Sequence, residues 1–169
     1  MSPDDGRDLD VRIEGEVLIR LAGREREYFR DPDATGRMWR DGWLHSGDIG
    51  FLDEDGYLYI VGRMKDVIIR GGNNIHATDV EAVLHEHPSV QEAAVVGVPH
   101  EVLGEDIAAF VVRVPGRELD TDELLAFCRE RMAPDKVPRM VTWCDALPRN
   151  ATGKVVKDEL RRSTWHAPI

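Results

Sequence analysis

The segment from Tyr57 to Glu81 constrains the fold of this chain most, because it places two apolar runs, a charged joint and a glycine pair in close succession. Alternating side chains over residues 57–61 predict a strand. A charged joint at 63–66 separates it from a second apolar run at 67–69, which ends at two glycines. A cationic joint between two strands is not needed for stability, so we expect this segment to carry a function.

A helix is expected directly after this segment. Thr78 and Glu81 have the spacing of a capping box, in which each side chain bonds the backbone N–H of the other residue. The sequence therefore predicts that the helix begins at Thr78.

Three motifs in order resemble those of the adenylate-forming acid ligases, the ANL superfamily of AMP-binding enzymes, which comprises acyl-CoA synthetases, luciferases and adenylation domains. Its hinge motif is matched by Gly62–Asp66, Gly71–Ile75 and Asp79–Glu81, its Thr-Gly-Asp signature by Trp43–Asp48 with Ser46 in the Thr place, and its C-terminal lysine motif by Pro148–Lys154. The resemblance extends from about Gly15 to Arg162 and is strongest to the C-terminal part of acyl-CoA synthetases.

An α+β fold in two domains follows from the resemblance. Residues 1–64 would be the strands that close the distorted β-barrel of a large N-terminal domain. Residues 65–169 would form the small mobile C-terminal lid domain, with a three-stranded sheet, packed helices and a two-stranded hairpin. The apolar patterns predict strands at 15–21, 90–98, 107–114 and 140–144, a short helix or coil near 30–40, helices from 78, from 120 and over 155–162, and loops at 53–56 and 99–106.

Composition excludes several classes of partner. The 169 residues include 32 acidic and 22 basic side chains, and the net charge of −10 argues against binding to nucleic acid or anionic membranes. No run of eighteen apolar residues is present, so we expect no membrane span, and the polar, acidic start favours a cytoplasmic protein. Cys128 and Cys144 lack the spacing of a metal site, so we expect no metal and interpret both as buried apolar residues.

The family's glycine-rich phosphate loop and its acyl pocket, both far N-terminal to these motifs, have no counterpart in the chain. We therefore expect the C-terminal part of a ligase that is inactive alone. Its exposed barrel strands are expected to promote self-association. The acid substrate would be selected by the pocket that lies elsewhere.

The resemblance implies a reaction in two steps. A carboxylic acid attacks the α-phosphate of ATP, and coenzyme A then takes the acyl group from the adenylate. Lys154 would stabilise the charge of the first step, while Asp48 would bind the ribose hydroxyls and Arg63 would lie near the ribose and phosphate. ATP, with magnesium, would be bound mainly by the N-terminal domain.

The second step implies a movement of the lid domain. Lys65 matches the hinge position, whose backbone dihedrals would absorb the rotation. Gly71 and Gly72 would leave backbone exposed for the pantetheine arm of coenzyme A. Lys136 and Arg139 match a basic stretch that lies near the coenzyme A nucleotide in some members.

Two alternatives to a CoA ligase stay open. One is the corresponding part of an adenylation domain that transfers its acyl group to a carrier protein. The other is a non-catalytic module that docks on a protein. Read singly, a Gly-Lys pair, a turn aspartate or two glycines would indicate ordinary surface turns; it is their combination that favours the ligase.

Overall fold

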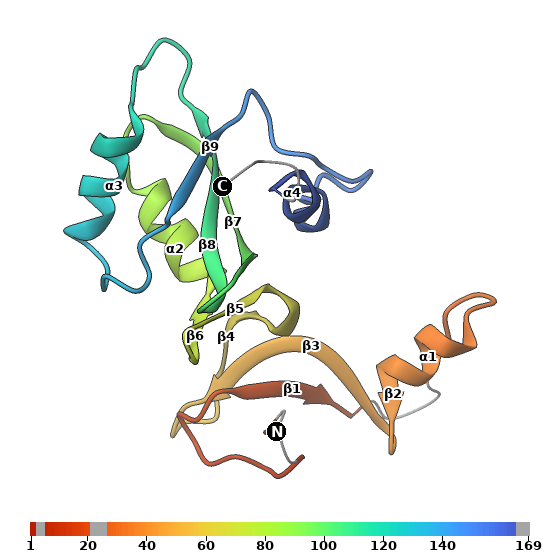
Figure 1. Cartoon of the computed structure of the whole chain (residues 1–169). Coiled ribbons are helices and arrows are strands. Elements are labelled where there is room, and N and C mark those ends of the chain that lie inside the picture. Colours follow the sequence, from red (N-terminus) through yellow and green to blue (C-terminus); the bar gives the residue numbers. More distant parts are fainter. Residues whose placement is uncertain (3–5, 21–26, 165–169) are drawn as a thin grey trace. The chain divides into compact units, whose positions relative to one another are not determined.

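The computed structural model describes residues 1–2, 6–20 and 27–164, and the chain divides into two compact units, Met1–Lys65 and Asp66–Ile169 (Figure 1). This division falls one residue after the boundary expected between residues 64 and 65.

The first unit is an antiparallel sheet built around one long strand, β3 (Trp43–Leu52). It pairs with β1 (Gly15–Ile19), β2 (Trp39–Arg40) and β4 (Leu58–Arg63). The strand predicted over 15–21 ends at Ile19 in the described part of the chain, and residues 21–26 lie outside it.

Local hydrogen bonds account for two connections in this unit. Asp53 Oδ1 accepts bonds from the N–H groups of Asp55 and Tyr57, which closes the predicted turn between β3 and β4. The short element expected near residues 30–40 is the helix α1 (Pro32–Met38), whose N-cap Asp31 accepts a bond from the Ala34 N–H at 2.8 Å.

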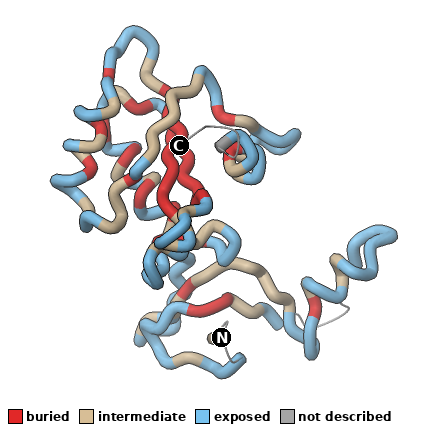
Figure 2. The backbone as a smooth tube through the Cα atoms, viewed as in Figure 1, coloured by how far each residue is buried: buried red, intermediate tan, exposed pale blue. Residues whose placement is uncertain are grey.

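Apolar burial is slight in the first unit. Trp39 is its buried apolar side chain among the described residues, whereas the side chains from Tyr57 to Ile60 are exposed. Figure 2 shows only short buried stretches here, in contrast to the continuous ones in the second unit.

The second unit has an α+β fold. The 3-10 turn η1 (Met64–Asp66) spans the boundary between the units. The helices and strands that follow are β5 (Val67–Arg70), β6 (Asn73–His76), α2 (Ala77–His85), β7 (Val90–His100), β8 (Gly104–Arg113), α3 (Thr121–Arg129), β9 (Met140–Trp143) and α4 (Lys157–Thr164).

The predicted sheet and hairpin are both present. Strand β8 pairs antiparallel with β7 and parallel with β9, and β5 with β6 forms the two-stranded hairpin. A single residue pair, Arg70 with Gly104, joins the hairpin to β8. The fold is thus the expected three-stranded sheet with packed helices and an attached hairpin.

Both faces of the β7–β8 pair are covered, which explains the unbroken apolar runs in their sequences. On one face, Val95, Ala109 and their alternate neighbours pack against the helices α2 and α3. On the other face, Val96 and Phe110 belong to a second cluster that includes Leu160 of α4. Figure 1 shows α2 and α3 on one side of these strands and α4 on the other.

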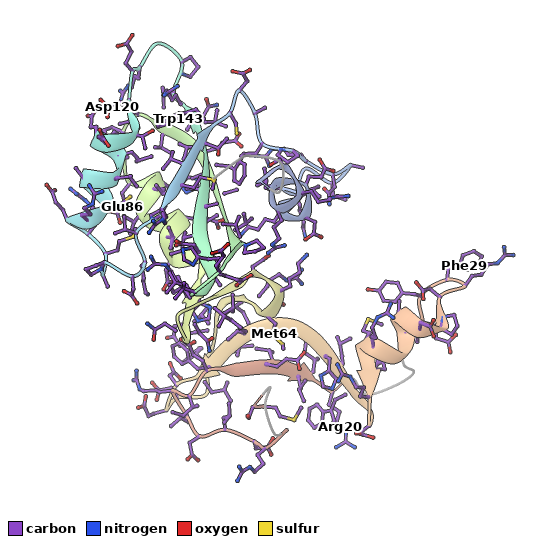
Figure 3. The ribbon with its side chains drawn as sticks, viewed as in Figure 1. Arg20, Phe29, Met64, Glu86, Asp120 and Trp143 are labelled. Carbon is purple, nitrogen blue, oxygen red and sulfur yellow. The ribbon has the colours of Figure 1, made fainter. Side chains whose placement is uncertain are left out.

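Helix α3 begins as its sequence predicts. Its N-cap Asp120 accepts a 2.7 Å bond from the Glu123 N–H, and Trp143 of β9 donates to Thr121 Oγ1 in the same first turn (Figure 3). The last helix starts at Lys157 rather than at residue 155, because Val155 forms a β-bridge with Arg149.

Three other predictions were wrong. The capping box is absent, because the helix begins at Ala77 with His76 as its N-cap, and Glu81 Oε1 instead accepts a bond from the Val95 N–H. The loop expected over residues 99–106 shrinks to 101–103, because the ladder between β7 and β8 continues to its tip. Cys144, expected to be buried, is only half-buried.

Candidate functional site

The first unit contributes an acidic and a basic side chain that face each other across two strands. Asp48 of β3 lies opposite Arg63 of β4 in the ladder, and Arg63 Nε donates to Asp48 Oδ1 at 2.7 Å. The Arg63 side chain is 54% exposed and that of Asp48 is 33% exposed. Both predicted nucleotide-binding residues are thus brought together at an accessible position.

A bulge in β3 sets the position of Asp48. Between its pairings at Leu18 and Glu16 of β1, strand β3 inserts extra residues around Gly47, which has a φ of +69°. Ser46 Oγ donates to the Val17 carbonyl at 2.7 Å and accepts a bond from the Asp48 N–H.

Glu16 closes the same bulge from β1. Its carboxylate, in a residue only 8% exposed, accepts a 3.2 Å bond from the Gly47 N–H and lies 2.8 Å from His45 Nδ1. The segment before Asp48 is therefore fixed by buried polar contacts to a neighbouring strand. A bulge of this kind commonly aims a side chain at a functional site.

Lys65 is the exposed last residue of the first unit and the central residue of the 3-10 turn η1. Asp66 begins the second unit. The expected hinge residue thus lies at the division between the two compact parts of the chain.

Gly71 and Gly72 are the two turn residues of the β5–β6 hairpin. Arg70 pairs with Asn73, so the loop contains only these two glycines, with φ values of +58° and +87°. Positive φ at both central positions is the geometry of a type I′ turn, which favours glycine. Apart from Gly72 itself and its two chain neighbours, no described residue has an atom within 4 Å of a Cβ placed on Gly72, so its backbone is bare on that side.

The start of β8 holds this hairpin through its backbone. The Leu103 carbonyl accepts a bond from the Gly71 N–H, and Glu105 Oε2 accepts one from the Ile69 N–H, both at 2.8 Å. The glycine turn therefore sits on a rigid support rather than on a free loop.

Asp106 connects the hairpin to the loop that carries the predicted basic residues. The buried Asp106 carboxylate accepts a 2.7 Å bond from Arg70 Nε, while Arg70 Nη1 donates to the Asp135 carbonyl. Arg139 Nε lies 3.8 Å from the other Asp106 oxygen, which accepts no hydrogen bond from the residues that the structure describes.

A groove of about 420 Å³ lies between these elements, lined by Arg70, Leu125, Arg129, Pro134, Val137, Pro138 and Arg139. Three of the seven side chains are arginines, and that of Arg139 is 70% exposed, so the groove can accept an anion. Lys136 is not among its lining residues: its Nζ lies 2.8 Å from Asp79 Oδ2 at the start of α2. The structure thus brings Arg139 and the glycine turn to one region and turns Lys136 toward α2.

Lys154 closes a tight turn organised by Asn150. Asn150 Oδ1 accepts bonds from the N–H and hydroxyl of Thr152 and from the Lys154 N–H, at 2.8–3.0 Å. The Asn150 N–H donates in turn to the Lys154 carbonyl. These bonds give the segment from Asn150 to Lys154 a defined local structure.

The Lys154 side chain is exposed and forms no ion pair within residues 1–2, 6–20 and 27–164. Its neighbour Arg149 anchors the turn, donating to the Gly153 carbonyl and to Glu92 of β7 at 2.6 Å each. The turn thus holds the backbone of Lys154 and leaves its ammonium free for a ligand.

The Lys154 turn and the glycine hairpin are anchored at opposite ends of the β7–β8 pair. Glu92 lies near the start of β7, whereas Gly104, to which the hairpin pairs, lies opposite His100 at its end. At about 3.3 Å per strand residue these anchors are roughly 25 Å apart. The predicted catalytic lysine and the predicted pantetheine contact are therefore on separate parts of the unit.

Sequence reasoning missed the residues that position these groups. Glu16 and Asp106 are buried carboxylates within strands, and nothing in their local sequence distinguishes them from surface acids. Asn150 lies inside a recognised motif, and its Asx-type side chain before a glycine was the signal that could have predicted a turn.

Neither thiol is poised for catalysis. Burial raises the pKa of Cys128 and of Cys144, which disfavours the thiolate that a nucleophile requires. Within the described ranges, no three His, Cys, Asp or Glu side chains are grouped so as to hold a metal ion, and no helix is long and apolar enough to cross a membrane.

Residues 79–154, which include most of α2, the three-stranded sheet and the Lys154 turn, match the family described as AMP-binding enzyme C-terminal domain. This match lies within the second unit of the chain. Outside this match lie Asp48, Arg63 and the glycine turn.

Relatives extend the similarity over both units. The chain is 44% identical to a 2-succinylbenzoate–CoA ligase of Geobacillus kaustophilus, over 94% of this chain and 32% of the relative. It is 42% identical to the fatty acid–[acyl-carrier-protein] ligase ScoC of Streptomyces coeruleorubidus, over 95% of this chain and 31% of that protein. The chain thus spans about a third of the length of the relatives that it matches.

A solved structure agrees with the fold. The ATP-bound MatB from Rhodopseudomonas palustris superposes with a TM-score of 0.89 at 36% identity, covering 98% of this chain and 33% of that protein. Both units of this chain thus have counterparts in a solved protein about three times as long.

Proposed function

We propose that this chain is the C-terminal part of an ATP-dependent carboxylic acid–CoA ligase. The observation that carries the proposal is the Lys154 turn, because it holds the backbone of an exposed cation that has no ion-pair partner in the described part of the chain, at the end of the segment that matches the family. Similarity to acid–thiol ligases over nearly the whole chain supports the same assignment.

In the first half-reaction, a carboxylate oxygen of the acid attacks the α-phosphorus of ATP, and the bond to pyrophosphate breaks. Two anions approach each other, so the transition state needs a cation where the charge concentrates. The Lys154 ammonium supplies it. Asp48 accepts hydrogen bonds from the ribose hydroxyls, and Arg63, its partner on β4, orients that carboxylate and lies toward the phosphates.

In the second half-reaction, the coenzyme A sulfur attacks the carbonyl carbon of the adenylate, and AMP leaves. The bare backbone at Gly72 accommodates the pantetheine arm, and Arg139 attracts the nucleotide phosphates from the basic groove. Lys136 takes a lesser part, since Asp79 already neutralises it. Between the two half-reactions, rotation at Lys65 moves the Lys154 turn away from the reacting centre and brings the glycine turn to it.

Transfer to a carrier protein is the second candidate. A relative named for an acyl carrier protein favours it. Both acceptors present the same pantetheine thiol, so Gly71 and Gly72 have the same task in either case. The two acceptors differ because coenzyme A carries a nucleotide and a carrier protein does not. The groove beside Arg139 would bind that nucleotide.

A chimeric ligase tests the proposal. This chain replaces the C-terminal third of the Geobacillus relative, and acyl-CoA formation is measured with ATP, magnesium, 2-succinylbenzoate and coenzyme A or acyl carrier protein. We expect an active chimera and an inactive isolated chain. A chimera that folds but is inactive would support the alternative of a non-catalytic docking module. Acid-dependent pyrophosphate release by the chain alone would refute the expectation that this chain needs the N-terminal part of a ligase for activity.

A further inference from the structure

An ion pair ties the first residue of the second unit to its last helix. Asp66 Oδ1 lies 2.8 Å from an Nη2 atom of Arg161, which is 95 residues further along the chain. The Asp66 side chain is 15% exposed and that of Arg161 is 26% exposed. The pair is thus largely shielded from water, and it is screened by salt much less than a surface pair.

The geometry of Arg161 favours one fixed orientation. Its second terminal nitrogen, Nη1, lies 2.7 Å from Asp158 one turn earlier on α4. The planar guanidinium is therefore held between two carboxylates, one on its own helix and one on the segment after Lys65. A lysine could not bridge the two in this forked manner.

Helix α4 has a second attachment, one turn before Arg161. Lys157 Nζ lies 2.8 Å from Glu81 Oε1, and Glu81 accepts a bond from the Val95 N–H of β7. Leu160, between the two cations, is buried against the sheet. The helix therefore stays attached when either ion pair is removed, so single variants at Arg161 are expected to fold.

The Lys154 turn leads directly into this helix. Only Val155 and Val156 separate them: Val155 pairs with Arg149, and the Val156 N–H donates to the Pro148 carbonyl. Both strands of the turn are thus fixed immediately before α4 begins. A displacement of α4 would consequently displace Lys154.

We propose that Arg161 is a positioning residue that couples the start of the second unit to Lys154. Because Asp66 is held against α4, rotation is confined to residues before Asp66. Any reorientation of the segment that begins at Asp66 therefore moves Lys154 by the same rotation. This inference rests on the proposed function, in which Lys65 is the hinge and Lys154 the adenylation cation. It adds the mechanical link between them.

Hydrogen exchange of the 169-residue chain tests the link without any activity. Arg161→Gln and Asp66→Asn each remove one charge at nearly constant volume. We expect the amides of Asn150, Lys154 and α4 to exchange about tenfold faster in each variant. The double variant should exchange no faster than Arg161→Gln alone, because both substitutions break the pair between Asp66 and Arg161. Amides of the β8 interior, such as Ala109, should keep their protection.

Arg162→Gln is the matched control. Arg162 is the next residue on α4, is exposed, and makes a backbone contact to the Asp158 carbonyl. Its removal should leave exchange at Lys154 unchanged. Unchanged exchange at Lys154 in Arg161→Gln, or an equal acceleration throughout β8, would overturn the proposal, since the second result indicates general destabilisation.

The chimeric ligase supplies the functional readout. Arg161→Gln should lower the rate of adenylate formation about tenfold and leave the KM for the acid unchanged, because the residue repositions Lys154 and does not touch the acid. The Asp66→Arg, Arg161→Asp exchange should recover part of that loss. If the unmodified chimera makes no adenylate, the proposed function fails. The hydrogen-exchange experiment on the 169-residue chain still decides whether Arg161 couples Asp66 to the Lys154 turn.

Discussion

Asp48 and Arg63 are directly opposed on neighbouring antiparallel strands, and a 2.7 Å bond joins their side chains. The Asp48 carboxylate can accept hydrogen bonds from ribose hydroxyls, and Arg63 holds this carboxylate in place. Because both side chains are substantially exposed, the pair itself contributes under about 1 kcal/mol to folding.

Asp48→Ala in the chimeric ligase should therefore weaken ATP binding with little effect on stability. We expect the KM for ATP to rise at least about tenfold, because hydrogen bonds to a charged acceptor are lost. Arg12→Gln is the control: it breaks another exposed ion pair of the same unit, with Glu54 at 2.6 Å, and should leave that KM unchanged. Equal changes in both variants would argue against a nucleotide contact at Asp48.

Lys154→Ala should separate the two half-reactions. Loss of a cation that acts in the adenylation transition state should slow adenylate formation by roughly 10²–10³. Thioester formation from a synthetic adenylate should fall much less, since the rotated domain carries Lys154 away. The measurements are pyrophosphate–ATP isotope exchange and thioester release. Equal losses in both would indicate a folding defect.

Gly72→Leu should affect the opposite step. A leucine side chain would occupy the bare side of the turn and obstruct the pantetheine arm, so thioester release should slow while isotope exchange persists. Gly72→Ala provides the comparison, because it imposes the same cost of about 1–2 kcal/mol at positive φ with a single methyl group. Similar thioester rates in the two variants would show that bulk at this position does not matter.

The two cysteines should differ in their reactivity toward iodoacetamide. Burial raises the pKa of both thiols, but Cys128 is fully buried and Cys144 only half-buried. At pH 8 we expect alkylation at Cys144 first, and at Cys128 only once the unit opens. Mass spectrometry of the peptides distinguishes them, and rapid labelling of Cys128 in the folded chain would contradict the packing of α3 against the sheet.

The isolated chain should self-associate through its first unit. Strand β4 pairs with β3 on one side and exposes Leu58, Tyr59 and Ile60, with Ile60 55% exposed. Sedimentation should show species larger than the monomer, and Ile60→Lys should shift the distribution toward monomer. Val102→Lys, at an 84% exposed apolar residue of the other unit, is the control. A monomer at all concentrations would refute the expectation.

The apolar runs of β7 and β8 made the central sheet predictable, because strands that are buried on both faces leave no polar alternation. The glycine pair likewise indicated a turn, since few other residues adopt two successive positive φ values. Local chemistry misled at Thr78: the spacing suited a capping box, but Glu81 instead bonds β7 and Lys157. The side chain of Glu81 thus bonds residues that are far away in the sequence.

The positioning residues lay beyond sequence reasoning for the same cause. Asp106 appeared to belong to a loop of turn-forming residues, yet it is buried and binds Arg70. Asp66 and Arg161 are far apart in the chain, and nothing in a single sequence relates them. Candidate ligand contacts were readable from motifs, while the groups that hold them emerge only from the folded arrangement.

The contact between Asp66 and Arg161 also bears on how the chain is made. A ribosome releases the start of the second unit long before α4, so Asp66 waits unpaired while the intervening sheet is synthesised. The cluster around Phe110 and Leu160 is likewise incomplete until the last helix emerges. The second unit therefore closes only after α4 has been synthesised, whereas the described strands of the first unit are available much earlier. Premature termination ahead of α4 would release a domain whose opening residue and sheet face both remain uncovered, a natural substrate for quality-control proteases.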